Sequence, residues 1–362
     1  MPDSKILSIS IPTWNRAELL EEQLILLTKQ IIENNLEDKI EIVISNNGSD
    51  DNTEEVVLKF RSKHDFIIYH NNGVNKGPRF NVIKSLELAT GKYVTFLGDD
   101  DRYKEDSFKK IISLLTTNHE IGAIFDSHLF KKNPFKNEVF ISLEQLLENF
   151  YYYIGNAGLF IIKTEFIHNN IKKFGYEYFS ASWPQTQLIT LSLFQNPDKK
   201  ILLSDLDLFS ASAHDQVMMY NSYYLLRGLY FDLADAITDI KNEISPECYA
   251  SARIYLKKTV SQTTFNILQC GVFVDDKELR IKTISYIKSN LKKYSVNEKI
   301  YLSLIIFALS LPVSISRLLS DIFIFAVKGK KGINKKNRFV KLELEKLENK
   351  KHKNKAVRTF EF

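Results

Sequence analysis

Short apolar runs alternate with amphipathic stretches over the first 130 residues of the chain. The apolar runs have the length of strands, and the stretches between them repeat their apolar positions at helical spacing. Strands are predicted over residues 6–11, 40–44, 66–69 and 92–97, and helices over residues 17–34, 53–61 and 79–89. Strand–helix alternation at this pitch predicts an α/β fold with a doubly wound, mainly parallel, Rossmann-like sheet.

Three polar loops follow predicted strands, over residues 13–16, 46–51 and 99–102. In a doubly wound sheet the carboxyl ends of the parallel strands lie at one edge, and ligands bind outside that edge. Topology alone therefore predicts that these three loops converge on one binding site.

The remainder of the chain changes its pattern twice. Helix and strand signals continue to about residue 220. The following stretch reads as helical and carries no evident motif, and an apolar segment and a basic tail come after it. The sequence therefore predicts a first domain over residues 1–220, a helical region over 221–299 and a membrane-associating C-terminal part over 300–362.

The apolar segment, residues 300–327, is interrupted by Pro312 and, in its second half, by Arg317 and Asp321. Each apolar run is too short to cross a bilayer alone, and the charges disfavour one continuous span. The lysines of residues 328–331 follow directly, which fits helices lying in the interface of an anionic membrane. A helical hairpin buried in the protein core, with a solvated basic tail, is the alternative.

Composition describes an ordinary globular protein. The chain has 362 residues, of which 44% are hydrophobic and 26% charged, enough for one large domain with an appendage or for two domains. Its two cysteines, Cys248 and Cys270, fit neither a disulfide framework nor a zinc site, so we expect an intracellular, cytoplasmic chain. The short apolar run near the start reads as a strand and not as a signal peptide.

Charge is spread unevenly along the chain. The formal net charge is +5, but residues 328–358 hold 13 Lys and Arg against three Glu. This tail carries about +10, which leaves the rest of the chain near −5. A basic block at one end favours an anionic partner, either a membrane surface or nucleic acid. Because the tail lacks interleaved aromatic residues over most of its length, we expect the membrane surface and no nucleic acid.

Three consecutive aspartates, Asp99, Asp100 and Asp101, follow the strand predicted over residues 92–97. Adjacent carboxylates at the rim of an apolar sheet repel one another unless a cation or strong hydrogen bonds stabilise them. Oxygen ligands of this kind favour Mg2+ or Mn2+, and these metals usually bridge the phosphates of a substrate. The run of aspartates therefore predicts a divalent metal site.

Five short motifs appear in order over the first 106 residues: Pro12–Arg16, Asn46–Thr53, Asn75–Gly77, Ala89–Tyr93 and Phe96–Asp101. Together they resemble the family 2 glycosyltransferases with the GT-A fold. Residues 150–215 are similar, more narrowly, to the abequosyltransferase-like sugar transferases of O-antigen assembly. That second resemblance rests on the stretches Gly155–Phe160, Ser182–Gln185 and Leu203–Leu206.

The resemblance implies a hexosyl- or deoxysugar-transferase, inverting like most of the family. It would move a sugar from a UDP-, CDP- or GDP-linked donor to a hydroxyl of a glycan carried on polyprenyl diphosphate. Such a reaction uses Mn2+ or Mg2+ on the donor diphosphate and belongs to the assembly of bacterial surface polysaccharide or O-antigen. The chain would act in the cytoplasm, peripheral on the inner face of the cell membrane. A non-catalytic member that binds a nucleotide sugar or serves as a scaffold is the alternative.

The resemblance also assigns roles to the aspartates. In the register of the family's Asp-x-Asp motif, Gly98 stands at the first aspartate and Asp100 at the second. We therefore expect Asp100 to bind the metal directly and Asp99 to face the ribose or the metal. Asp101 and His214 would complete the surroundings of the metal. The alternatives are a helix cap for Asp101 and a structural role for His214.

The residues expected to contact the nucleotide follow the first two strands or begin the third helix. They are Thr13, Asn15, Arg16, Asn46, Asn47 and Arg79. Asn46 and Asn47 stand where the family usually has carboxylates, which leaves the preferred base open. The alternatives are a turn role for Asn47, an ion pair with a nearby acid for Arg16 and a solvated surface position for Arg79.

An inverting transferase needs a carboxylate as general base to deprotonate the acceptor hydroxyl. Where the family usually has an acidic pair, this chain has Trp183 with no carboxylate next to it. Three carboxylates remain as candidates: Glu177, Asp126 and Asp215. Trp183 itself either stacks on a sugar ring or belongs to the core.

Overall fold

The computed structural model describes residues 5–117, 120–127, 138–150, 154, 158–180, 183–204, 208–210, 230–270, 277–312, 314–316, 318–319 and 322. The chain divides into two compact units. The first contains the residues up to Gln216 together with Asp232–Tyr255, and the second contains Val217–Phe231 and the residues from Leu256 onward. The three-part division expected from the sequence stays a prediction.

In the part of the chain that the structure describes, the first unit is built on an eight-stranded sheet of order β3-β2-β1-β4-β8-β6-β9-β7. β3, β2, β1 and β4 are parallel, β8 runs against β4 and β6, β9 is parallel to β6, and β7 is antiparallel to β9. Only β7 and β8 therefore run against the others, which confirms the predicted mainly parallel α/β sheet. The strands are β1 (Leu7–Thr13), β2 (Ile40–Asn46), β3 (Ile67–Asn71), β4 (Tyr93–Phe96), β6 (Ile121–Asp126), β7 (Val139–Ile141), β8 (Phe160–Lys163) and β9 (Lys200–Ser204).

The central strand β1 alternates apolar and small polar residues, yet both of its faces are buried. Its serines can be buried because other side chains form hydrogen bonds with their hydroxyls. The Ser8 hydroxyl donates to Glu41 at 2.6 Å, and Ser10 bonds to Ser85 at 2.8 Å. A strand covered by helices on both faces needs such pairs wherever it is not apolar.

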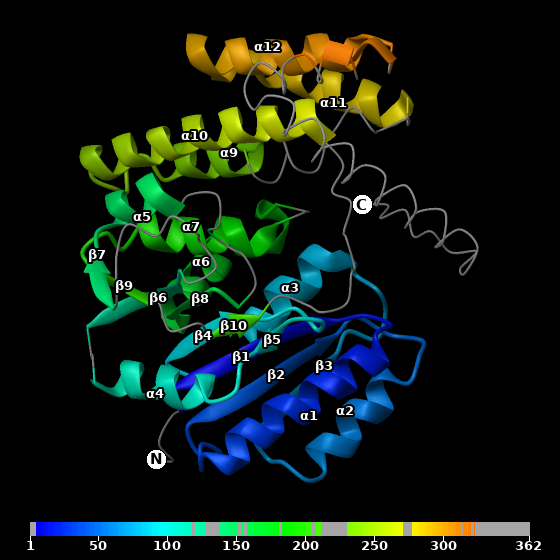
Figure 1. Cartoon of the computed structure of the whole chain (residues 1–362), viewed down its shortest axis with the longest axis vertical. Helices are drawn as coiled ribbons and strands as arrows, with labels where there is room; N and C mark the ends of the chain where they lie inside the picture. The colour runs from blue at the N-terminus through cyan, green and yellow to red at the C-terminus, as the bar shows by residue number, and fades with distance from the viewer. Residues whose placement is uncertain are drawn as a thin grey trace. The chain divides into compact units, whose positions relative to one another are not determined.

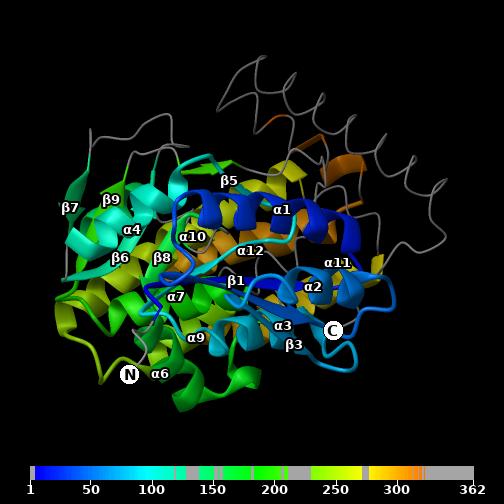
Figure 2. The same cartoon turned by 90° about the horizontal axis from the view of Figure 1, so that it is seen from below.

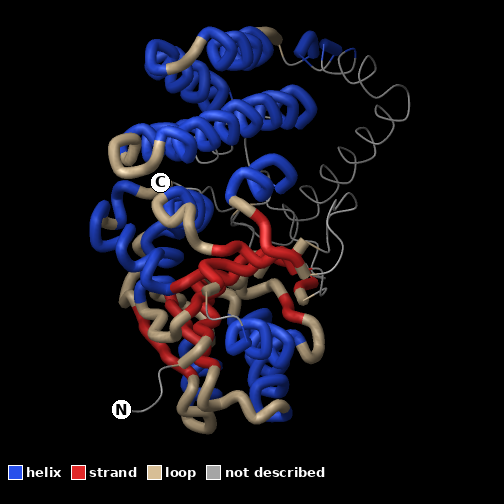
Figure 3. The backbone as a smooth tube through the Cα atoms, turned by 90° about the vertical axis from the view of Figure 1, so that its left-hand side faces the viewer, coloured by secondary structure: helices blue, strands red, loops and turns tan. Residues whose placement is uncertain are grey.

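Helices cover both faces of this sheet. α1 (Ala17–Glu33) and α2 (Thr53–Arg61) lie on one face of the β1–β4 half, and α3 (Gly77–Glu87) lies on the other (Figures 1 and 2). α6 (Thr164–Phe174) and α7 (Pro184–Phe194) pack with α3. Figure 3 shows the twisted strands with helices on both sides. The other helices of this unit are α4 (Ser107–Thr117), α5 (Leu143–Phe150), α9 (Asp232–Asp239) and the first part of α10 (Pro246–Cys270).

The buried side of α1 is a helical stripe. Leu20, Leu24 and Leu27 are buried on it. Ile25 and Leu26 lie outside the stripe and are exposed. Leu26 lies two positions beyond Leu24, which places it about 200° around the helix axis.

In the second unit, α11 (Lys277–Asn290) packs beside α12 (Val296–Ser310) (Figure 1). Aromatic rings of Tyr230, Phe231 and Tyr294 contact one another beside these helices. α12 begins with a capping box, in which Ser295 and Glu298 satisfy each other's backbone amides. Of the helices that the structure describes, none has the length and apolar character needed to cross a bilayer.

Candidate functional site

The loops that follow β1, β2 and β4 meet at the carboxyl edge of the sheet. Thr13, the last residue of β1, donates its hydroxyl to Asp99 Oδ2 at 3.0 Å. The backbone amide of Asn15 donates to Ser49 Oγ at 2.8 Å, and Asn15 Oδ1 accepts from the Asp50 amide at 2.7 Å. The predicted convergence of the three polar loops is therefore confirmed.

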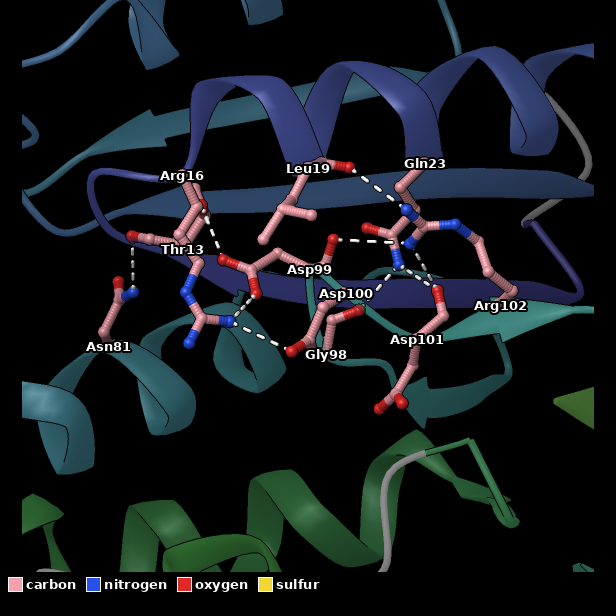
Figure 4. Close-up of polar contacts among 10 residues, drawn as sticks. All are labelled: Thr13, Arg16, Leu19, Gln23, Asn81, Gly98, Asp99, Asp100, Asp101 and Arg102. Atoms are coloured by element: carbon pink, nitrogen blue, oxygen red, sulfur yellow. Dashed lines mark hydrogen bonds and ion pairs between the residues drawn. The ribbon is translucent and has the colours of Figure 1, made fainter. Parts of the chain in front are cut away.

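Asp99 is the most buried of the three aspartates and carries an ion pair. Arg16 Nη1 lies 2.6 Å from Asp99 Oδ1 and 3.3 Å from Asp100 Oδ2 (Figure 4). Burial raises the pKa of Asp99 and the neighbouring Asp100 adds to this, while Arg16 and the Thr13 hydroxyl act in the opposite direction. Burial disfavours charge on Arg16, but attraction by both carboxylates outweighs it, so the pKa of Arg16 is raised. Arg16 thus neutralises part of the charge of the cluster.

Residues 98–101 form a tight turn whose carbonyl groups are held from two sides. The Asp101 amide donates to the Gly98 carbonyl at 3.1 Å, which closes the turn. Gln23, fully buried in α1, donates through Nε2 to the carbonyls of Gly98 at 2.6 Å and Asp101 at 2.8 Å. Arg102 Nη1 donates to the Asp101 carbonyl at 2.9 Å (Figure 4). Helix α1 and Arg102 together fix the backbone that carries the aspartates.

The glycine at position 98 has a steric reason. A Cβ atom there would lie 2.8 Å from Asp101 Oδ2 and 3.0 Å from Asp100 Oδ1. Both carboxylates therefore have an oxygen close to this Cβ position, and the ends of the Asp100 and Asp101 side chains would have to shift to admit a side chain at residue 98. The Asp101 carboxylate lies beside Gly98, and position 98 is where the Asp-x-Asp motif has its first aspartate. Asp99 instead turns toward Thr13 and Arg16.

The convergence of Asp100 and Asp101 on Gly98 fits a hard divalent cation. Mg2+ and Mn2+ are commonly held by one or two carboxylates, and substrate phosphates and water complete the coordination. Within the described residues, no group of three or more His, Cys, Asp or Glu side chains surrounds a single metal position. His214, the third residue expected near a metal, lies outside the described residues. The alternative role of Asp101 as a cap of a helix near Lys104 is wrong, because α4 begins at Ser107.

Asn46 and Asn47 are buried, and both side chains bind protein groups. Asn46 donates to the Tyr69 hydroxyl at 3.0 Å and accepts from the hydroxyl of Ser49 at 2.7 Å. Asn47 Nδ2 donates to Asn75 Oδ1 at 2.8 Å and to the Gly77 carbonyl at 3.2 Å. Asn47 Oδ1 accepts from Asn72 Nδ2 at 3.0 Å and from the Lys76 amide at 3.1 Å. The two amides thus connect β2 to the loops around them.

Gly48 takes the conformation that its place in the turn suggests. Its φ is +66°, a value that side-chain-bearing residues rarely adopt. A Cβ atom here would also lie 2.7 Å from the backbone of Val74, in the loop before α3. The glycine therefore allows two loops of the site to approach each other closely.

Arg79 and Glu177, expected in different roles, form an ion pair. Arg79 lies in the first turn of α3, and Glu177 lies in the short 3-10 helix Tyr176–Tyr178. Arg79 Nη1 also points to the carbonyls of Glu177 and Phe179, each at 3.4 Å. The Glu177 side chain is 84% exposed, whereas that of Arg79 is only 25% exposed. Arg79 is therefore held in place and is not a freely solvated surface residue.

The other candidates for the general base differ in what the structure shows of them. Asp126, at the end of β6, is buried and accepts a hydrogen bond from the Leu208 amide at 2.8 Å. Asp215 lies outside the described residues, like His214. Trp183 is half-buried at the start of α7. Asp126 therefore anchors the chain near Leu208, and of the two candidates that the structure describes Glu177 is the one with an accessible carboxylate.

The sequence analysis did not identify Gln23, whose side chain in α1 donates to the carbonyls at both ends of the turn of residues 98–101. A signal for it exists in the pattern of α1. Gln23 lies on the same helical stripe as the buried Leu20 and Leu27, three positions after one and four before the other. A polar side chain on a buried stripe needs a buried partner. The pattern does not name that partner, because the carbonyls of residues 98 and 101 are distant in sequence.

Comparison with known proteins gives a family for much of the first unit. Residues 8–171 match the model of the family described as Glycosyl transferase family 2. The chain is 41% identical over 117 residues to a protein of Salmonella typhimurium named abequosyltransferase RfbV, covering 32% of this chain and 34% of that protein. It is 32% identical over 127 residues to the GalNAc(5)-diNAcBac-PP-undecaprenol beta-1,3-glucosyltransferase of Campylobacter jejuni, covering 35% of this chain and 39% of that protein. The matches thus span less than half the length of these relatives.

Solved structures share the fold at low sequence identity. The chain aligns with TarS of S. aureus at a TM-score of 0.59 and 17% identity, covering 88% of this chain and 53% of that one. The 1–349 fragment of TarS in complex with UDP-GlcNAc aligns at a TM-score of 0.54 and 16% identity, covering 83% of this chain and 90% of the fragment. These likenesses agree with the GT-A fold expected from the motifs.

Proposed function

We propose that this chain, whose residues 8–171 are a family 2 glycosyltransferase domain, moves a sugar from a nucleotide-sugar donor to a hydroxyl of a lipid-linked glycan. The observation that carries the proposal is the turn of residues 98–101 at the carboxyl edge of the sheet. It brings two carboxylates together over Gly98, beside Arg16 and the loop after β1. A diphosphate donor needs both a metal position and a cationic group next to it.

The names of similar proteins support the classes of donor and acceptor. TarS forms complexes with UDP-GlcNAc and with UDP. The Campylobacter relative is named for a glycan on PP-undecaprenol, and the Salmonella relative for transfer of abequose. A UDP-, CDP- or GDP-linked donor and a polyprenyl-diphosphate-linked acceptor are therefore proposed here, in surface polysaccharide or O-antigen assembly at the inner face of the cell membrane.

Each part of the site has a proposed role in this reaction. Asp100 and Asp101 would hold Mn2+ or Mg2+, which when bound offsets the charge that develops on the diphosphate leaving group. Arg16 reduces the negative charge of the cluster by its contacts to Asp99 and Asp100, so that an anionic donor can approach. Thr13 fixes Asp99 from the other side.

The nucleotide would lie along the loops after β1 and β2, near Asn15, Asn46 and Asn47. Because the side chains of Asn46 and Asn47 are both engaged by the protein, they shape this region mainly by holding its loops. Arg79, held by Glu177 at the start of α3, is proposed to meet the diphosphate. Residues 1–220 would form the donor-binding domain, and the regions 221–299 and 300–362 would serve the acceptor and the membrane.

For the general base, Glu177 is the first carboxylate to test. Its side chain is exposed, and its ion pair with Arg79, which is proposed to meet the diphosphate, supports this choice. Asp126 is buried and engaged by the backbone of Leu208, which suits a structural role better. Asp215 stays the third candidate. A base must reach the acceptor hydroxyl, so accessibility decides the order of testing.

The test is release of UDP, CDP and GDP from a panel of nucleotide sugars, with and without Mn2+, in the presence of a lipid-linked acceptor pool. Asp100→Ala is expected to lower turnover by about 100-fold or more. Glu105→Ala is the matched control, since Glu105 is an exposed acid four residues beyond Asp101. If no donor turns over and Asp100→Ala leaves metal-dependent nucleotide binding unchanged, the enzymatic function fails and the non-catalytic alternative stands.

A further inference from the structure

The second unit exposes a continuous apolar stripe along α12. The stripe residues are between 47% and 73% exposed: Val296, Ile300, Leu304 and Phe307. Their spacing of four, four and three positions places them on one side of the helix. The opposite side, with Leu302, Ile305 and Leu309, is buried in the unit. α12 is therefore apolar on both sides, although only one side contributes to the core.

A second apolar row follows the turn at the end of α12. The described helical residues beyond Pro312 include four exposed apolar side chains at spacings of three, one and three positions: Ile315, Leu318, Leu319 and Ile322. Exposures between 39% and 59% show that this row also lacks a partner within the described residues. Together with the stripe of α12, these eight side chains form what we call the apolar surface.

The corner between the two rows is held by a buried arginine of α11. Arg280 donates to the Leu309 carbonyl at 2.7 Å and to the Ser316 hydroxyl at 3.5 Å. Its Nε also donates to Leu309, at 3.0 Å, so the carbonyls at the end of α12 gain donors that the helix itself cannot provide. Arg280 thus ties the helical residues beyond Pro312, through Ser316, to the end of α12.

The charges around the apolar surface are of one sign on α12. The helix contains a single acid, Glu298, which is buried and bonded to the Tyr230 hydroxyl at 2.9 Å. Lys292 and Lys293 are exposed just before α12, and Lys299 borders the stripe. In the sequence, the basic run beginning at Lys328 follows within a few residues of Ile322. An apolar stripe bordered by cations, as on α12, is complementary to an anionic bilayer interface.

We propose that the apolar surface inserts into the headgroup and acyl boundary of an anionic lipid bilayer, with Lys292, Lys293 and Lys299 contacting the lipid phosphates. The helices would lie in the plane of the interface, which suits their length. Membrane binding by the apolar surface goes beyond the sugar transfer proposed above. It rests on the proposed function only in its purpose, which would be to bring the chain to a lipid-linked acceptor.

The experiment measures co-sedimentation of the full chain with vesicles of phosphatidylglycerol and phosphatidylcholine, and with vesicles of phosphatidylcholine alone. The full chain is expected to bind the anionic vesicles at least about tenfold more strongly, and 0.5 M salt is expected to weaken that binding. The double variant Ile300→Asp/Phe307→Asp should lower the partition coefficient by about 100-fold, because two apolar anchors are lost and two negative charges are added.

A matched double variant, Ile25→Asp/Leu58→Asp, places the same change at exposed apolar residues of α1 and α2. It should bind vesicles within about twofold of the unchanged chain, and circular dichroism checks that both variants are folded. Equal loss in both variants, or equal binding to both vesicle types, would overturn the proposal. The proposal would also be overturned if the unchanged chain bound no vesicles but formed a dimer in solution that Ile300→Asp/Phe307→Asp abolished. The apolar surface would then join two copies of the chain. Vesicle binding needs no donor, so failure of sugar transfer is distinguishable from failure of the surface.

Discussion

At the scale of single residues, the site depends on the residues that shape and hold the turn of the aspartates. Gly98 leaves room for two carboxylates, and Gln23 holds the turn that carries them. In the sequence Gly98 is a departure from a motif, and its contacts with Asp100 and Asp101 depend on the tertiary structure. Gln23 carried only the weak signal of a polar residue on an apolar stripe. Sequence patterns report which residues are unusual, whereas the contacts that explain them join distant segments.

Replacing Gly98 by aspartate should impair the site although it restores the usual motif. The new Cβ would meet Asp101 Oδ2 at 2.8 Å, and a third carboxylate would be crowded against the other two. We expect Mn2+ affinity, measured by isothermal titration, to fall about tenfold or more. Gly98→Ala separates steric from charge effects, and Gly98→Asp with Asp101→Gly should recover much of the affinity. Unchanged affinity in Gly98→Asp alone would contradict the crowding described here.

Gln23→Leu should weaken the metal site through the backbone of the turn. Without Nε2, the carbonyls of Gly98 and Asp101 each lose a buried donor, at a cost of about 1–3 kcal/mol in the free energy of unfolding. Mn2+ affinity should also fall by about 10- to 100-fold. Gln30→Leu is the matched control on the same helix, since Gln30 Nε2 donates only to the Tyr103 carbonyl, at 3.3 Å. A similar drop in Mn2+ affinity for both variants would show that Gln23 acts through general stability alone.

At the scale of elements, the strands of the first 100 residues and their parallel direction follow from the sequence pattern, whereas the direction of β8 does not. The apolar runs around Ile9 and Ile42 predict strands, and the helices between them predict parallel neighbours. β8 runs against β4 and β6, which no local pattern of residues 160–163 indicates. Direction depends on the path of the connecting chain, so it needs the tertiary structure.

Two glycines in neighbouring loops should respond differently to the same substitution. Gly48 and Gly73 both have positive φ, +66° and +76°, so alanine costs about 1–2 kcal/mol of backbone strain at each. At Gly48 the added Cβ would also lie 2.7 Å from Val74, whereas nothing lies within 4 Å at Gly73. Urea unfolding should therefore show a larger loss for Gly48→Ala than for Gly73→Ala. Equal losses would mean that the loop of Val74 moves away freely.

At the scale of the whole molecule, the sequence predicts the first part of the chain in more detail than the last part. The motifs of the first 106 residues predict the GT-A fold and the family whose model residues 8–171 match. The region after residue 221 offered only helical pattern and apolar content. Its ordered contacts, such as Arg280 at the end of α12, come from pairs of residues about 30 positions apart. A long-range capping contact of this kind leaves no local signal.

Donor turnover by the whole chain should depend on a divalent metal. Removal of metal with EDTA is expected to lower nucleotide release by about 100-fold or more, because the diphosphate leaving group loses its counter-charge. Mn2+ or Mg2+ should restore activity in the unchanged chain but not in Asp100→Ala. The measurement is nucleotide release at fixed ionic strength. Full turnover in EDTA would show that Arg16 and Arg79 alone stabilise the leaving group.

The four hydrogen bonds of Asn47 limit how this protein can evolve. Its amide nitrogen donates to Asn75 Oδ1 and to the Gly77 carbonyl, and its oxygen accepts from Asn72 and Lys76. A mutation to aspartate would turn a donor into an acceptor facing two other acceptors. Such a variant would fold less stably unless the loops of Asn75 and Gly77 also changed. A carboxylate at this position therefore requires compensating changes in the loop before α3.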